Sequence, residues 1–209
     1  MADELADADH HGKAGIEAHG RTLDSAAIDV LFLCTGNICR SPMAEAMLAY
    51  RLAQLGVDAR VTSAGLLDND MVPPYEALAV LADMGLDTSG HRSRRMTVAM
   101  LEAADVVIGM ARRHVHEAIT LAPSVWPKTF TLKELVRRGG WVGPREPGQP
   151  FDEWLAKIHA GRTRSDLIGS SSDDDVPDPI GLSRRVYERT AMEIDGLIAG
   201  LMDLGWGLQ

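Results

Sequence analysis

Two nearly continuous apolar runs constrain the fold of this chain more than any other feature. IDVLFLC, at 28–34, and ADVVIGM, at 104–110, are short and carry almost no polar residues. Such runs are typical of strands that are buried on both faces of a parallel sheet. ARVTSAG at 59–65 and WPKTFTL at 126–132 predict two further strands, and a helical pattern follows each strand. The alternation predicts an α/β fold: a doubly wound, four-stranded parallel sheet with helices on both faces.

Caps and breakers set the expected helix boundaries. Ser41 and Pro42 suit the N-cap and the first turn of a helix, and Gly56 suits its end. His114 and His116 fall on a later helix that we expect at the surface, so neither is a good metal ligand. The predicted helices cover residues 41–55, 74–85, 111–122, 133–138, 151–162 and 182–204.

The charge and the cysteine content narrow the class of protein. The formal net charge is -9, which opposes a nucleic-acid-binding function. No apolar run approaches the roughly 18 residues that a membrane-spanning helix needs, and the N-terminus lacks the basic-then-apolar order of a signal peptide. We therefore expect no association with a membrane. The 2 cysteines form no disulfide framework, which favours a reducing cytoplasm.

The first residues differ in amino-acid composition from the rest of the chain. Residues 1–27 are acidic and poor in large apolar side chains, so we expect a disordered tail. His10, His11 and His19 offer a possible metal site, although a solvated polar tail is the preferred interpretation. The folded domain is predicted to cover residues 28–209.

Both cysteines, Cys34 and Cys39, lie in one loop, CTGNICR, between the first predicted strand and its helix. Such a strand end is where α/β proteins bind anions, because free N–H groups and the helix dipole point there. Gly36 permits a tight turn, and Arg40 offers a planar fork that matches two phosphate oxygens. The same field favours the thiolate of a cysteine that faces the pocket, placed for attack on phosphorus. The nucleotide-loop patterns GxxxxGK[ST] and GxGxxG are absent from this loop.

The loop and several distant segments resemble a known family. CTGNICRSP, followed by MAEAML, closely resembles the low-molecular-weight protein tyrosine phosphatases. TSAG at 62–65, HRSRRMT at 91–97, ADVVIGM at 104–110 and VPDP at 176–179 extend the resemblance over about residues 28–205. The combination is far more specific than the spacing of a cysteine and an arginine alone.

The resemblance implies four catalytic residues. Cys34 would be the nucleophile that forms a phosphocysteine, and Arg40 would clamp the phosphate. Ser41 would donate its hydroxyl to the Cys34 sulfur. Asp178 would protonate the leaving oxygen and then activate water. This chemistry needs no metal and no cofactor.

Other residues of the loop and two distant side chains receive supporting roles from the same resemblance. Asn37 would hold the loop in its strained shape, with Ser63 and His91 as hydrogen-bonding supports. The phosphate-binding residues would be Thr35, Gly36, Asn37, Ile38 and Cys39. Cys39 is also close enough to Cys34 to form a disulfide under peroxide, which would regulate the enzyme. The alternative is that Cys39 is only a small buried side chain.

Residues that flank the site bear on the substrate. Family members that act on phosphotyrosine often carry aromatic residues after the SAG and DP segments, whereas Leu66, Leu67 and Ile180 leave an aliphatic wall here. Ile38 resembles the tyrosine-type members, since the position is typically threonine in the related protein arginine phosphatases. The extra cysteines that an arsenate reductase needs are lacking beyond Cys39.

The predicted function is therefore hydrolysis of protein phosphotyrosine by a monomeric enzyme. A small phosphomonoester is a second possible substrate, and phosphate-like oxyanions are expected to inhibit. The alternatives are a protein arginine phosphatase and a catalytically weak anion-binding regulatory module.

A segment at about 139–175 is longer than the compact version typical of the family. We expect a loop at 139–150, an amphipathic helix and then an acidic turn, all forming a solvated elaboration of the surface. The alternative is a rim around the cleft. Four basic residues of this insert could contact an acidic substrate: Arg145, Lys157, Arg162 and Arg164. A solvated turn, not a metal site, is predicted for Asp173, Asp174 and Asp175.

Overall fold

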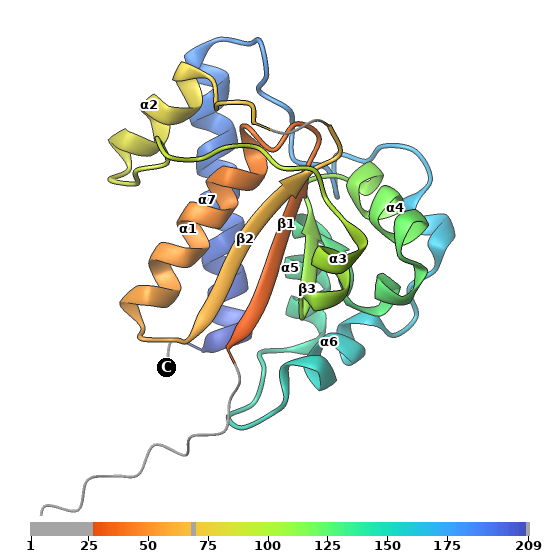
Figure 1. Cartoon of the computed structure of the whole chain (residues 1–209). Coiled ribbons are helices and arrows are strands. Elements are labelled where there is room, and N and C mark those ends of the chain that lie inside the picture. The colour runs from red at the N-terminus through yellow and green to blue at the C-terminus, as the bar shows by residue number, and fades with distance from the viewer. Residues whose placement is uncertain (1–26, 68–69, 208–209) are drawn as a thin grey trace, which may run out of the picture.

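The computed structural model describes residues 27–67 and 70–207, which include one four-stranded sheet. The strand order is β2-β1-β3-β4, and all three pairs are parallel (Figure 1). The strands are β1 (Ile28–Cys34), β2 (Ala59–Gly65), β3 (Val106–Gly109) and β4 (Thr129–Thr131). Helices cover both faces, which confirms the predicted doubly wound fold class. The tail at 1–27, with its three histidines, lies outside the described residues except for Ala27.

Side chains of β1 alternate between two apolar layers. Val30 and Phe32 face one core, whereas Leu31 and Leu33 face the other, and all four are almost fully buried. A strand between two helical layers must be apolar on both faces. The uninterrupted run in the sequence is therefore the direct result of a central position in the sheet.

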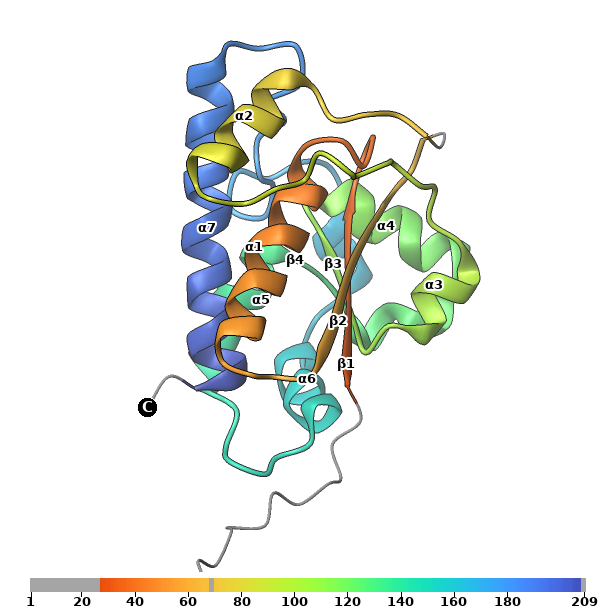
Figure 2. The same ribbon diagram turned by 60° about the vertical axis from the view of Figure 1, so that its left-hand side comes forward.

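The first helical layer packs on the face of Val30 and Phe32 (Figure 2). It comprises α1 (Arg40–Gln54), α2 (Tyr75–Asp83), α5 (Leu132–Val142), α6 (Phe151–His159) and α7 (Arg184–Trp206). The buried residues of α7 recur every three or four positions, the spacing of one helix face, and those of α1 do so from Met43 onward. None of the helices in the described part of the chain, α7 included, is long and apolar enough to cross a membrane.

The second layer covers the opposite face of the sheet. It comprises α3 (Val98–Ala103), α4 (Arg112–Leu121) and the short 3-10 turns η1 (Pro123–Lys128) and η2 (Arg164–Leu167). Val115, Ala118 and Ile119 of α4 pack against Leu31 and Leu33. Both cores therefore meet at β1, and the loop that follows β1 rests on a rigid support.

Several predicted boundaries are wrong, each for a local reason. Helix α1 begins at Arg40, so Ser41 is not its N-cap, and the Ser41 hydroxyl bonds the Cys34 sulfur instead. Helix α5 runs on to Val142 through two glycines, because Gly139 packs closely against Leu204. The fourth strand begins only at 129, since 123–128 forms a 3-10 turn. The short helix α3 was not predicted.

A buried ion pair fastens the insert to the domain. The guanidinium of Arg162 donates to both carboxylate oxygens of Glu134, at 2.6 and 2.9 Å, and to the carbonyl of Thr129 at 2.8 Å. It lies between the rings of Trp126 and Phe130, 4.0 and 4.1 Å from their centroids. Charged residues are buried in this way only when they are paired. Arg162 is therefore a structural anchor and is not available to a substrate.

Of the other three basic residues of the insert that were predicted to be available to a substrate, one is bound within the protein and two are exposed. The Arg145 guanidinium bonds the carbonyls of Gly205 and Gln149, so it too is engaged within the protein. Lys157 and Arg164 are exposed, as predicted. Helix α6 lies at the lower end of the molecule in Figure 1, away from the carboxyl ends of the strands. This helix therefore forms no rim around the loop that follows β1.

We predict that Arg162→Met lowers the free energy of unfolding by about 3–5 kcal/mol, because the Glu134 carboxylate is left buried without its partner. Urea denaturation measures this loss. The control is Lys157→Met, an exposed change in the same segment, for which we expect a change within about 0.5 kcal/mol. Equal losses in the two variants would contradict the anchoring role.

Candidate active site

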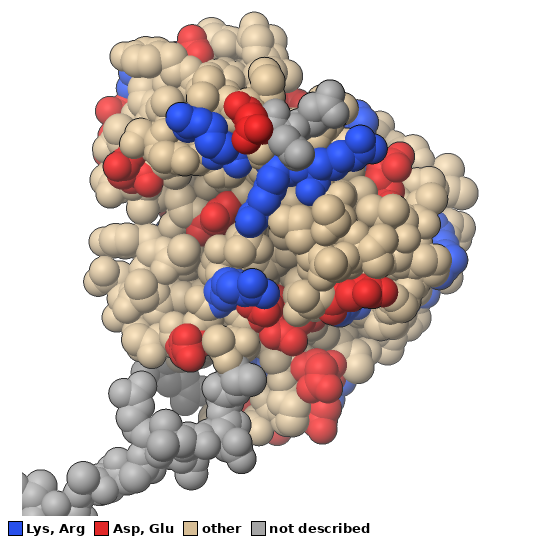
Figure 3. Space-filling view, viewed as in Figure 1, with Lys and Arg blue, Asp and Glu red and all other residues tan. Residues whose placement is uncertain are grey.

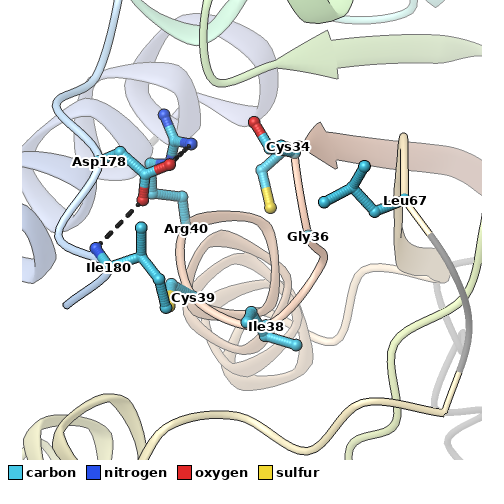
Figure 4. Close-up of a pocket in the computed structure, with 9 residues that line it drawn as sticks. Cys34, Gly36, Ile38, Cys39, Arg40, Leu67, Asp178 and Ile180 are labelled. Carbon is cyan, nitrogen blue, oxygen red and sulfur yellow. Dashed lines mark hydrogen bonds and ion pairs between the residues drawn. The ribbon is translucent and has the colours of Figure 1, made fainter.

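The loop between β1 and α1 lies at the carboxyl end of the sheet, where the chain connections diverge. β1 pairs with β2 on one side and with β3 on the other, so the loop sits at the topological switch point of the sheet. A cavity opens above the loop (Figure 4). It is lined by Cys34, Thr35, Gly36, Ile38, Cys39, Arg40, Leu67, Asp178 and Ile180.

Two donors point at the sulfur of Cys34. The backbone N–H of Asn37 lies 3.1 Å from the sulfur, and the Ser41 hydroxyl oxygen lies 3.0 Å from it. The sulfur is therefore held between a backbone donor of the loop and a side-chain donor of α1. The sulfur also faces into the cavity in Figure 4.

Asn37 is the hydrogen-bonding hub of the loop. It is fully buried and adopts a left-handed backbone conformation, with φ of 52°. Its side-chain amide donates to the hydroxyls of Ser41 and Ser63, at 3.0 and 2.7 Å, and accepts from the Arg94 backbone N–H at 2.9 Å. Nε2 of the His91 ring lies 2.7 Å from the backbone carbonyl oxygen of Asn37. A non-glycine residue at positive φ costs about 1–3 kcal/mol, and these four contacts offset that cost.

Arg40 is buried below the cavity and makes contact with Asp178, 138 positions away. One terminal nitrogen donates to the Val176 carbonyl at 3.0 Å, and the other donates to the Asp178 carboxylate at 2.5 Å. The second carboxylate oxygen of Asp178 accepts the Ile180 N–H. Nε of Arg40 has no partner among the described residues. The edge of the guanidinium formed by Nε and the Asp178-bound nitrogen is therefore the edge that an anion would use.

Charge is distributed unevenly over the surface around this end of the sheet. Figure 3 shows basic side chains gathered across the upper part of one face, with some acidic side chains among them and further acidic side chains below. The upper end of this view holds the carboxyl ends of β1 and β2. Such an arrangement attracts anions to this end in spite of the net charge of -9. Within residues 27–67 and 70–207, no group of three or more acidic, histidine or cysteine residues is arranged to hold a metal ion.

His114 is a part of the site that the sequence prediction missed. The prediction placed it on a surface helix, but its side chain is fully buried, and Nε2 lies 3.1 Å from the Thr35 hydroxyl. Burial, with the nearby positive charges of Arg40 and Arg113, lowers the pKa of His114 to about 3. The ring is therefore neutral at physiological pH. The apolar spacing of α4 places position 114 on its buried face, and this signal could have located the residue.

Tyr187, from α7, is a second contact that the sequence did not indicate. Its hydroxyl lies 3.9 Å from the sulfur of Cys39, and both side chains are buried. Burial raises the pKa of Cys39 to about 12, so this thiol stays protonated beside Cys34. The two cysteines of the loop are therefore held in different chemical environments.

Seven of the predicted site residues line the cavity, and the other four belong to the hydrogen-bond network of the loop: Asn37, Ser41, Ser63 and His91. The expected aliphatic wall is present in part, because Leu67 and Ile180 line the opening together with Ile38, whereas Leu66 is not among the lining residues. None of the described residues that line the cavity is aromatic. A planar substrate would therefore pack against aliphatic groups.

Comparison with known proteins identifies the family to which the chain belongs. A family model described as low molecular weight phosphotyrosine protein phosphatase matches residues 29–145, more than half of the chain. The chain belongs to this family. The predicted resemblance is thereby confirmed, and the protein is a phosphatase of the cysteine-dependent kind.

Individual relatives of the phosphatase fall into two groups. The low molecular weight protein-tyrosine-phosphatase Etp of Escherichia coli is 35% identical over 125 residues, which cover 58% of this chain and 76% of Etp. A protein-arginine-phosphatase of Bacillus subtilis is 29% identical over 176 residues, which cover 83% of this chain and 94% of that protein. The crystal structure of a low molecular weight protein tyrosine phosphatase from T. tengcongensis is similar with a TM-score of 0.65, at 32% identity, over 85% of this chain and 99% of the other.

We predict that His114 makes the phosphatase sensitive to acid. Because the pKa of this histidine is lowered in the folded state, the unfolded chain binds a proton below about pH 6.5 and the folded chain does not. Stability contributed by the neutral ring is thus complete above that pH and is lost as the pH falls toward 3. At pH 4.5 the loss is about 3 kcal/mol relative to pH 7.

His114→Gln should remove most of that loss, and urea denaturation at pH 7 and at pH 4.5 measures it. The matched control is His116→Gln, an exposed change on the same helix. We expect the control to keep the acid sensitivity of the wild type. The same pH dependence in wild type and His114→Gln would exclude the buried neutral ring as its source.

Proposed function

We propose that this phosphatase hydrolyses phosphate monoesters of tyrosine side chains in proteins through a phosphocysteine intermediate. The observation that carries the proposal is the convergence of three groups on one cavity: the Cys34 sulfur, the Arg40 guanidinium and the Asp178 carboxyl group. They supply a nucleophile, an anion clamp and a proton donor. A binding module would need neither the thiol nor the carboxyl group.

In the first step the substrate phosphate occupies the loop. Its oxygens accept hydrogen bonds from the backbone N–H groups and from the Arg40 guanidinium, which also stabilise the charge of the transition state. The Cys34 thiolate attacks phosphorus while the bond to the ester oxygen breaks. The protonated Asp178 carboxyl group gives its proton to that oxygen, so the alcohol leaves neutral.

In the second step the same groups act in reverse. The Asp178 carboxylate takes a proton from a water molecule, whose oxygen attacks the phosphorus of the phosphocysteine. The sulfur–phosphorus bond breaks, inorganic phosphate leaves, and the Ser41 hydroxyl stabilises the departing thiolate across 3.0 Å. The product and similar oxyanions compete with substrate for the same loop.

Arg40 and Asp178 must separate during this cycle. In the structure they form an ion pair that occupies the guanidinium nitrogen facing the cavity. A bound phosphate dianion takes that nitrogen, and the freed carboxyl group becomes available to carry the proton. Since Asp178 must be protonated while Cys34 is ionised, activity has an acidic to near-neutral optimum.

Cys39 supports regulation by peroxide. Hydrogen peroxide converts the Cys34 thiolate to a sulfenic acid, and the neighbouring Cys39 thiol then displaces water to form a disulfide. The bond blocks the nucleophile reversibly. A reducing cytoplasm, the expected location of the enzyme, would restore it by thiol–disulfide exchange.

Protein phosphoarginine is the second candidate substrate. The relative that is named a protein-arginine-phosphatase matches 83% of this chain, against 58% for Etp. Against it stands Ile38, which lines the cavity beside Leu67 and Ile180 and presents an apolar surface to the leaving group. Such a surface suits a phenyl ring better than a charged guanidinium.

We predict that Cys34→Ser abolishes turnover of 4-nitrophenyl phosphate and keeps the binding of tungstate, because the anion clamp is intact. Asp178→Asn should lower kcat about 100-fold on phenyl phosphate, whose leaving group needs a proton, and much less on 4-nitrophenyl phosphate. Steady-state kinetics and calorimetric titration with tungstate measure these effects. Turnover that survives Cys34→Ser would exclude the proposed nucleophile.

The choice of substrate is tested at position 38. We predict that the wild type prefers a phosphotyrosine peptide to a phosphoarginine peptide and that Ile38→Thr lowers kcat/KM for phosphotyrosine about tenfold, as apolar contact is lost. Ile180→Thr is the control for a general loss of apolar wall. A wild type that prefers phosphoarginine would keep the mechanism and reverse the assignment of the substrate.

A further inference from the structure

The ion pair between Arg40 and Asp178 cannot hold the acid in place during turnover. On the function proposed above, the bound phosphate takes the Arg40 nitrogen that Asp178 occupies in the structure. The Asp178 side chain is partly exposed, and its other contact is the N–H of Ile180, two residues away. The segment that carries the acid therefore needs an anchor that the substrate does not compete for.

Asp174 has the position and contacts of such an anchor. The prediction of a solvated turn is wrong for this residue, which is 6% exposed. Its two carboxylate oxygens accept from Arg112 of α4 and from Arg137 of α5, each at 2.7 Å. Arg137 also donates to the carbonyl of Asp173. Charge-assisted bonds of this kind are the strong ones, and here they join the end of the insert to two helices on opposite faces of the sheet.

The next two residues continue the attachment. Asp175 accepts the backbone N–H of Arg112 at 2.8 Å and that of Ser171 at 3.1 Å. The N–H of Val176 donates to the Met110 carbonyl at 2.8 Å, directly beyond β3. The Val176 carbonyl in turn accepts from Arg40. Residues 174–176 are thus fixed to the same edge of the sheet from which the phosphate loop rises.

The chain from this anchor to the acid is short and stiff. Asp178 lies two residues beyond Val176, which is at most about 7 Å of extended chain. Pro177 and Pro179 flank it, so the backbone on both sides of the acid has restricted φ. A displacement of the anchor is therefore passed on to the carboxyl group instead of being absorbed.

We propose that Asp174, with Arg112 and Arg137, is a positioning residue for the general acid Asp178. The insert would then serve catalysis through its last residues, although its helix lies at the other end of the molecule. Asp174 does not touch the cavity and takes no part in the chemistry. It keeps the carboxyl group within reach of the leaving oxygen after the phosphate has displaced it from Arg40.

The test compares Asp174→Asn with Asp173→Asn. The two changes remove the same charge from adjacent residues, but the Asp173 side chain is exposed and is not bound to either arginine. Steady-state kinetics are measured on phenyl phosphate and on 4-nitrophenyl phosphate. For Asp174→Asn we expect a loss of about 10- to 100-fold in kcat on phenyl phosphate and less than about threefold on 4-nitrophenyl phosphate. Asp173→Asn should match the wild type on both.

A double variant separates positioning from a general loss of structure. In an Asp178→Asn background there is no acid to position, so Asp174→Asn should change kcat on phenyl phosphate by less than about twofold. Equal losses on the two substrates, a loss that persists in this background, or full activity of Asp174→Asn would each overturn the proposal. If Asp174→Asn does not fold, Arg137→Gln removes one of the two bonds from the partly exposed side, and the same pattern is expected at smaller size.

These outcomes are distinct from a failure of the proposed function. Asp178→Asn alone tests the acid, because it must show the leaving-group dependence before Asp174 can be interpreted through it. If Asp178→Asn loses both substrates equally, the acid role itself is wrong. If Asp178→Asn shows the dependence and Asp174→Asn does not, only the positioning role is wrong.

Discussion

The buried amide of Asn37 is the interaction on which the rest of the site depends. It holds a left-handed turn in place by bonding Ser41 in the first turn of α1, Ser63 on β2 and the backbone of Arg94. The turn directs the N–H of Asn37 at the Cys34 sulfur. The neighbouring strand must approach closely for this, and a Cβ atom on Gly65 would lie 2.9 Å from the loop backbone. A glycine at the end of β2 is therefore a requirement of the loop and not of the strand.

Much of the fold could be predicted because its cause is local. β1 and β2 both have the predicted bounds, and for β1 the reason is that burial on two faces leaves an apolar run in the sequence. The residues of the candidate site were identified through a resemblance, because no physical pattern in the sequence links Cys34 to Asp178 across more than 140 positions. Local composition failed at Asp174, which looks solvated among its acidic neighbours but meets partners 62 and 37 residues away. The predicted loop from Gly139 is wrong for the same reason, because packing against a distant helix overrides the low helix propensity of glycine.

The insert combines two structural tasks that its sequence does not separate. Its middle part packs far from the cavity, where the Arg162 guanidinium is stacked between two aromatic rings and paired with Glu134. Its last part returns to the carboxyl end of the sheet and leads directly into the segment of Asp178. An elaboration of the surface can thus be attached at one end of a domain and act at the other. The ion pair of Arg162 with Glu134 and the ion pairs of Asp174 with Arg112 and Arg137 mark these two ends.

Arg40 connects the loop between β1 and α1 with the segment that carries Asp178, and this has a consequence for the design of inhibitors. On the proposed mechanism, an oxyanion that enters the loop breaks the contact between Arg40 and Asp178 and leaves a carboxylate at the mouth of the cavity without its cation. A simple oxyanion bears the cost of that separation and gains nothing from the released carboxylate. A ligand that carries a phosphonate and, a few bonds away, an ammonium group would satisfy both members of the broken pair. The aliphatic side chains of Leu67 and Ile180 line the cavity and form an apolar surface against which the linker between the two charged groups could pack.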